Sequence, residues 1–67
     1  MNNEGYERLC SVFIKTFASV PDRLRSEIIV LADGQPYTWE SAFIEVKAKT
    51  EKSREIIKEL KKLEIIG

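Results

Sequence analysis

The stretch ADGQPYTWES, residues 32–41, decides the fold because it fits two different structures. Asp33-Gly34 is typical of the tip of a β-hairpin, here between strands Ile28–Leu31 and Tyr37–Val46. Alternatively, the glycine closes one helix and Thr38 caps the next. Only the helical interpretation leads to a hypothesis about function, and the residues on either side of this stretch bear on the choice.

The segment after the turn favours a helix. Apolar residues follow the cap at helical spacing, namely Trp39, Ala42, Phe43 and Val46. A strand through the same residues would mix large apolar and charged side chains on one face. Thr38 is a good N-cap, because its hydroxyl can accept a hydrogen bond from the first helical turn. We therefore predict a helix that begins at Trp39.

The segment before the turn is ambiguous. Ser19-Val20-Pro21 is typical of a helix start, since proline costs little in the first turn. Leu24, Ile28, Leu31 and Ala32 then follow at helical spacing. Residues 28–31 are also rich in β-branched side chains, which favour a strand. We predict a helix that ends near Gly34, and the hairpin stays open as the alternative.

The two ends of the chain carry the clearest helical patterns. Gly5–Ala18 has an apolar stripe made of Tyr6, Leu9, Cys10, Phe13 and Phe17. After Thr50, a suitable cap, a second stripe consists of Ser53, Ile56, Ile57, Leu60 and Leu63. The predicted fold is mainly α, a small four-helix domain with a helix-turn-helix, in which residues 1–67 form a single domain. The alternative is α+β, an α-β-β-α fold with a two-stranded hairpin at 26–47.

The composition excludes several classes of function. The 67 residues include 11 basic and 11 acidic side chains, so net charge provides no general attraction to nucleic acid or membrane. There is one cysteine, Cys10, and no histidine, which excludes a Cys/His zinc site and a Ser–His or Cys–His pair within the chain. The three glycines are far apart and form no phosphate loop. We therefore expect no enzyme activity, no metal, no cofactor and no small-molecule substrate.

The apolar pattern also bears on location. No apolar run approaches the roughly 20 residues of a membrane span. The lone cysteine cannot form a disulfide within the chain, which is typical of a reducing compartment. We expect a cytoplasmic protein that does not enter a membrane.

Three stretches carry a resemblance to a known class: RSEIIVLADGQPYTWESA, VKAK and SREIIKELKKLEII, which together cover most of residues 25–66. Their pattern of apolar positions and turns resembles the winged-helix and helix-turn-helix DNA-binding domains of bacterial and archaeal transcription regulators. The sequence departs from that pattern at Glu64, where glycine is usual, and at Phe43, where a small residue is usual. No wing hairpin is expected before Gly67.

The resemblance implies that helix 50–63 enters the major groove of double-stranded DNA. The implied DNA contacts are Lys47, Lys49, Thr50, Lys52, Ser53 and Arg54, with Thr38 near a phosphate at the preceding helix start. Residues 47–67 agree, since they hold seven basic and four acidic side chains. However, the face of this helix opposite its apolar stripe holds two glutamates and two lysines. Their charges cancel, as on an ordinary solvated surface.

The competing hypothesis is a non-enzymatic protein-interaction domain that acts as a homodimer or an adaptor. It rests on apolar residues outside the predicted core stripes: Val12, Ile14, Ile29, Ile44, Ile65 and Ile66. An exposed and contiguous set of such residues would mark an interface.

Overall fold

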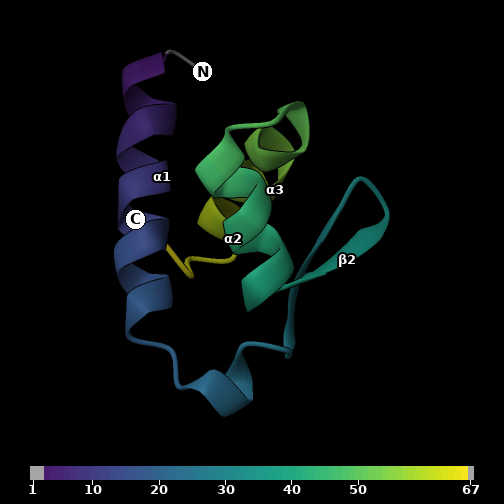
Figure 1. The fold of residues 1–67 in the computed structure, drawn as a ribbon. Helices are drawn as coiled ribbons and strands as arrows, with labels where there is room; N and C mark the ends of the chain where they lie inside the picture. Colours follow the sequence, from purple (N-terminus) through teal and green to yellow (C-terminus); the bar gives the residue numbers. More distant parts are fainter. Residues whose placement is uncertain (1–2, 67) are drawn as a thin grey trace.

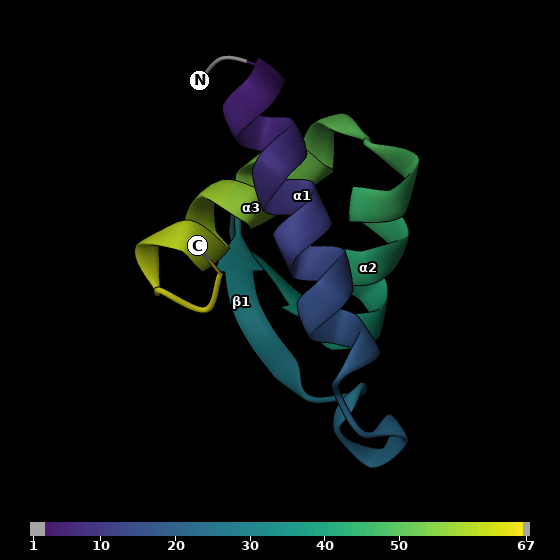
Figure 2. The same ribbon diagram turned by 90° about the vertical axis from the view of Figure 1, so that its left-hand side faces the viewer.

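The structure, a computed structural model, describes residues 3–66. Its elements are helix α1 (Asn3–Ala18), the 3-10 turn η1 (Asp22–Leu24), strands β1 (Ile28–Ala32) and β2 (Gln35–Thr38), and helices α2 (Trp39–Ala48) and α3 (Glu51–Lys62). Figure 1 shows α2 and α3 between α1 on one side and the hairpin on the other. Figure 2 shows α1 crossing over both of these helices. Within residues 3–66, the fold therefore combines three α-helices with one two-stranded antiparallel hairpin.

The hairpin forms because the two central turn residues adopt left-handed backbone angles. Asp33 has φ 52° and Gly34 has φ 78°, as a tight two-residue hairpin turn requires. The strands pair Ala32 with Gln35 and Leu31 with Pro36. The helix predicted over this part of the chain is therefore wrong. The β-branched side chains of β1 prevailed over its helical spacing, because pairing with β2 satisfies the backbone of both strands.

The second strand stops at Thr38, where α2 begins. The Thr38 hydroxyl accepts a hydrogen bond from the Ser41 N–H at 3.0 Å, and the Thr38 N–H donates to Ser41 Oγ at 2.8 Å. This reciprocal capping box ends the strand and starts the helix at one residue. The helix predicted from Trp39 is confirmed, and the long second strand of the hairpin alternative, reaching residue 46 or 47, is wrong.

Each of the two competing folds was therefore correct for one part of the chain. A four-helix domain is not what forms, because η1 and β1 occupy the place of its second helix. A hairpin that included residues 37–47 would take the place of α2 and exclude a helix-turn-helix. A strand of only four residues leaves both α2 and α3 intact.

The core lies where α1, α2, α3 and the inner face of the hairpin meet. Its buried members are Tyr6, Leu9, Cys10, Phe13, Val30, Ala32, Tyr37, Ala42, Val46, Ile56, Ile57, Leu60 and Ile66. Two aromatic pairs join α1 to α2. Phe13 stacks on Trp39 with ring centroids 5.8 Å apart, and Phe17 stacks on Phe43 at 4.1 Å. Among the helices of residues 3–66, none has the length and apolar character needed to cross a membrane.

The end of α3 turns back toward the core through a left-handed residue. Glu64 has φ 59°, and its N–H donates to the Lys61 carbonyl at 3.0 Å. The Ile65 N–H donates to the Leu60 carbonyl at 3.0 Å. This is the Schellman arrangement, in which glycine is the usual left-handed residue. The reversal directs Ile66 into the core.

Glu64→Gly is expected to stabilise the fold. A residue with a Cβ loses about 1–2 kcal/mol in the left-handed region, and glycine loses part of that gain through the extra freedom of the unfolded chain. We expect a net gain of about 0.5–1 kcal/mol in the free energy of unfolding, measured by urea denaturation. Glu55→Gly, on the exposed side of the same helix, is the control and should destabilise by about 1 kcal/mol. A loss of stability in Glu64→Gly would contradict the left-handed assignment.

Candidate functional site

The predicted DNA-binding element is the α2–α3 pair. A two-residue turn joins these helices: Lys49 closes α2 in a left-handed conformation with φ 53°, and Thr50 caps α3. This turn is shorter than the usual helix-turn-helix connection, which has about three or four residues. The first turns of α1 lie over the start of α3, because Tyr6 and Glu7 contact residues of this turn and of α3. The end of α3 that would read bases is therefore partly covered.

Three of the predicted DNA-contacting cations have partners within the chain. Lys49 Nζ forms an ion pair with Glu7, and this hydrogen bond raises the pKa of Lys49. The Arg54 guanidinium lies 4.4 Å from the centroid of the Tyr6 ring. Lys47 Nζ lies 5.6 Å from the centroid of the Phe43 ring. All three side chains remain exposed, and contacts of this kind are weak at exposed sites, so they orient the cations along α1 and α2 without burying them.

Ser53 is a structural residue and does not reach the surface. Its side chain is 0 % exposed, so the DNA contact inferred for it is wrong. Ser53 Oγ donates to the Thr50 carbonyl at 2.5 Å and also bonds to the Tyr6 hydroxyl. Because the one Ser53 hydroxyl proton is used in the first bond, Tyr6 is the donor in the second. The sequence carried this signal, since Ser53 falls on the apolar stripe of α3.

The two candidate threonines serve as helix caps. Thr50 Oγ1 accepts from the Ser53 N–H at 3.2 Å and donates to Glu45 Oε1 at 2.6 Å. Thr38 forms the capping box of α2. Both hydroxyls therefore stabilise helix starts, which accounts for these residues without a nucleic acid.

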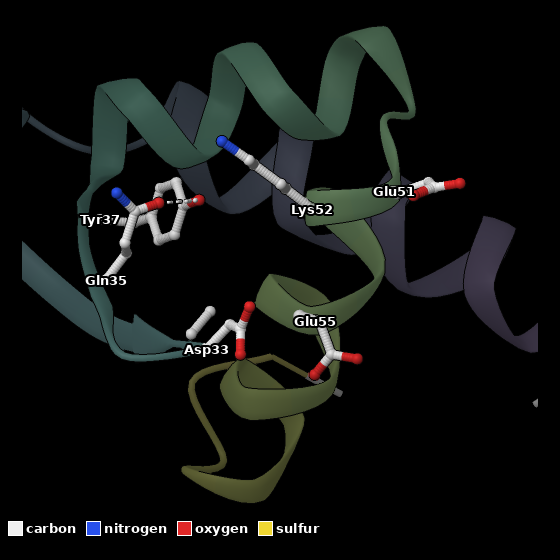
Figure 3. A pocket seen from close by; sticks show the side chains of 7 residues that line it. Asp33, Gln35, Tyr37, Glu51, Lys52 and Glu55 are labelled. Carbon is white, nitrogen blue, oxygen red and sulfur yellow. Dashed lines mark hydrogen bonds between the residues drawn. The ribbon is translucent and has the colours of Figure 1, made fainter.

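The remaining candidate, Lys52, lines a hollow of about 300 Å³ between the hairpin turn and the first turns of α3. Figure 3 shows Asp33 and Glu55 on the same side of this hollow, with the Tyr37 hydroxyl donating to Gln35 Oε1 at 3.4 Å. The full lining is Ala32, Asp33, Gln35, Tyr37, Glu51, Lys52 and Glu55. Three carboxylates and one ammonium group give this hollow a negative charge, which opposes contact with DNA phosphates.

The buried polar side chains near α1 provide no reactive group. Burial raises the pKa of the Cys10 thiol and the pKa of the Tyr6 hydroxyl, so both groups stay neutral near pH 7. A thiolate, not a thiol, is the nucleophile of cysteine chemistry. Within residues 3–66, no group of His, Cys, Asp and Glu side chains could hold a metal ion.

The apolar residues predicted as an interface are dispersed. Ile66 is buried in the core at 3 % exposure, so its assignment to an interface is wrong. Val12 and Ile65 are partly buried and pack against the core. Ile14 and Ile44 are exposed. Val12 and Ile44 line two different hollows, so these residues do not form one surface.

A different apolar surface is formed by Ile28, Ile29 and Leu31 of β1 together with Leu63 after α3, and we call it the β1 surface. Ile28 is 64 % exposed, Leu31 63 % and Leu63 57 %, and Ile29 is half-buried. With Val30 and Glu59, these residues line a hollow of about 410 Å³. The sequence reasoning missed it because Ile28, Leu31 and Leu63 had been placed on the buried stripes of helices.

No family model, curated protein or solved structure matches this chain. The resemblance to helix-turn-helix domains therefore stays a prediction from the sequence pattern.

Proposed function

We propose that this chain is a non-enzymatic protein-interaction domain that binds its partner through the β1 surface. The observation that carries the proposal is the gathering of Ile28, Leu31 and Leu63, each more than half exposed, around one hollow. Single exposed apolar residues are ordinary, whereas a contiguous group of them is typical of an interaction site. The free and buried thiol of Cys10 agrees with a cytoplasmic location.

The size of the β1 surface favours a transient complex. Full burial of a large aliphatic side chain contributes about 1.5–3 kcal/mol, and these three side chains are already partly buried. Covering them would contribute on the order of 3–5 kcal/mol. Loss of translational and rotational freedom on association costs about 4 kcal/mol or more. Side-chain burial alone is therefore too weak for a tight complex, and the partner has to make additional polar contacts.

Helix-turn-helix DNA binding is the second candidate function. The observation in its favour is the α2–α3 pair with its short turn, followed by exposed Lys58, Lys61 and Lys62 on α3. It has less support than protein binding, because the predicted contacts at the start of α3 are engaged within the chain or lie beside carboxylates. A titration of a random-sequence DNA duplex at two salt concentrations tests it. Binding that weakens steeply with salt would favour this candidate.

We expect Leu31→Lys to lose binding to protein partners at least tenfold while the fold is kept. Lysine is the residue that natural edge strands use to prevent pairing, so the hairpin should tolerate it. The measurement is a selection from a library of displayed peptides against the pure protein, followed by affinity measurements on the selected peptides. Circular dichroism verifies that the variant is folded.

The matched control is Ile44→Lys, which changes an exposed isoleucine on α2, away from the β1 surface. Selected peptides should bind this variant as they bind the unchanged protein. Peptides that bind Leu31→Lys normally but lose affinity for Ile44→Lys would show that the interaction site lies elsewhere.

A further inference from the structure

The outer edge of β1 is open. Leu31 is opposite Pro36, which has no N–H, so this pair cannot be a hydrogen-bonded pair of the ladder. Pairs alternate along an antiparallel ladder, which makes Val30–Tyr37 and Ala32–Gln35 the hydrogen-bonded pairs and directs the Leu31 N–H and C=O away from β2. Among residues 3–66, no backbone hydrogen bond from outside the hairpin reaches Leu31 or Ile29.

The two strands differ in how their edges are protected. Natural edge strands avoid unwanted pairing through charged residues, proline or a covering segment. β2 contains Pro36, whereas β1 has the sequence IIVLA, without a charge or a proline. The exposed side chains of Ile28 and Leu31 lie on this same unprotected strand. β1 therefore offers backbone hydrogen bonds and apolar contacts to the same partner.

We propose that the β1 surface binds by strand addition, in which an extended segment of another protein pairs antiparallel with the outer edge of β1. This inference rests on the proposed function and names its partner. The Leu31 N–H and C=O bond to the backbone of the added strand, and Ile28 and Leu63 contact its apolar side chains. The backbone bonds supply the polar contacts that side-chain burial lacks.

The charges along β1 define the partner further. At the turn end, Asp33 lies beside Glu51 and Glu55 across the acidic hollow, with only Lys52 opposing them. Farther from the turn, Ile28 and Leu63 line one hollow with Glu59, whose carboxylate is paired with Lys62 at 3.3 Å, so this hollow offers mainly apolar contacts. An antiparallel strand starts at the turn end of β1. Its first residues are therefore basic, and alternating apolar residues follow toward its C-terminal end.

A second copy of this chain, paired symmetrically about Val30, fits the edge less well. The symmetric pairing that would set Ile29 opposite Leu31 of the other copy is centred on Val30. It also sets Glu27 opposite Asp33 at both ends of the new ladder. Like charges directly opposite one another destabilise strand pairing. A separate segment whose first residues are basic avoids this repulsion, and its basic side chains are attracted to Asp33.

The test uses synthetic peptides and the isotope-labelled full chain in NMR titrations. The probe peptide KRVTITVT carries blocked ends, and its two controls are EDVTITVT and a version of the probe with N-methyl groups on alternate amides. We expect the probe to shift the Leu31 amide and to slow its hydrogen exchange. Both control peptides should bind at least tenfold more weakly. Asp33→Asn should weaken binding of the probe about threefold or more, while Glu27→Gln should leave it unchanged.

Other results would overturn the inference in distinguishable ways. If the N-methylated peptide binds as well as the probe and Leu31→Lys abolishes both, the surface binds without strand pairing and the proposed function stands alone. If no peptide binds and sedimentation shows a dimer that Leu31→Lys dissociates, a second copy occupies the edge. If no peptide binds and the chain stays monomeric, strand addition is wrong. Failure of the display selection as well would contradict the proposed function itself.

Discussion

Phe13→Ala is expected to remove a large share of the domain's free energy of unfolding at 25 °C. Phe13 is 0 % exposed, and its ring stacks on Trp39 with an interplanar angle of 24°. Truncation of a buried phenylalanine costs about 3–5 kcal/mol. At about 0.05–0.15 kcal/mol per residue, the total stability of a chain of this length is on the order of 3–10 kcal/mol. Circular dichroism during urea denaturation measures the loss.

The neighbouring residue Ile14 supplies the control, because it lies on the same helix at 39 % exposure. Ile14→Ala should cost less than about 1 kcal/mol, since little apolar area is buried there. If Phe13→Ala kept the denaturation midpoint of the unchanged protein, α1 would not pack on α2 as described.

The second large effect is expected at the buried Tyr6–Ser53 pair. Ser53→Ala should cost about 1–3 kcal/mol, because it leaves the buried Tyr6 hydroxyl without its acceptor. The nearby thiol of Cys10 is a poor substitute, since sulfur accepts hydrogen bonds weakly. Tyr6→Phe should cost about 1 kcal/mol, because Ser53 still donates to the Thr50 carbonyl.

The double variant tests whether the two hydroxyls act together. The double variant should lose about 1 kcal/mol less of the free energy of unfolding than the two single variants lose together, because the unpaired Tyr6 hydroxyl is no longer present. Urea denaturation of all four proteins gives this coupling energy. Strict additivity would mean that the pair does not exist. A neutral Ser53→Ala would mean that Ser53 is exposed, and it would restore this residue as a candidate DNA contact.

Helices α2 and α3 could be predicted from the sequence because each combines apolar residues at helical spacing with a cap, and α1 could be predicted from its apolar stripe. Thr38 and Thr50 are the caps that were expected, and the helices following them start at Trp39 and Glu51. The hairpin could not be predicted with the same pattern. Residues 28–32 fit both a helix and a strand, and the second strand was tested over too great a length. Alternation fails beyond Thr38, and within the four residues of β2 only Tyr37 is buried, so this strand carries too short a pattern to be recognised.

The candidate site depended on tertiary contacts that no local pattern contains. Ile28 and Leu31 are exposed because β1 is the outer strand on this side of the hairpin, not part of a helix. Ile66 is buried because the left-handed turn at Glu64 reverses the chain, although glutamate rarely adopts such a turn. Burial of Ser53 could be predicted from its place on the apolar stripe, whereas the resemblance to DNA-binding domains implied a contact at the helix start.

Amide hydrogen exchange of the free protein tests the open edge of β1 most directly. We expect the Val30 and Ala32 amides to be protected, because they face β2, and the Leu31 amide between them to exchange rapidly. This alternation should be the same at low and high protein concentration. A Leu31 amide that is as well protected as its neighbours at every concentration would mean that the edge is already covered, and it would contradict binding through the β1 surface.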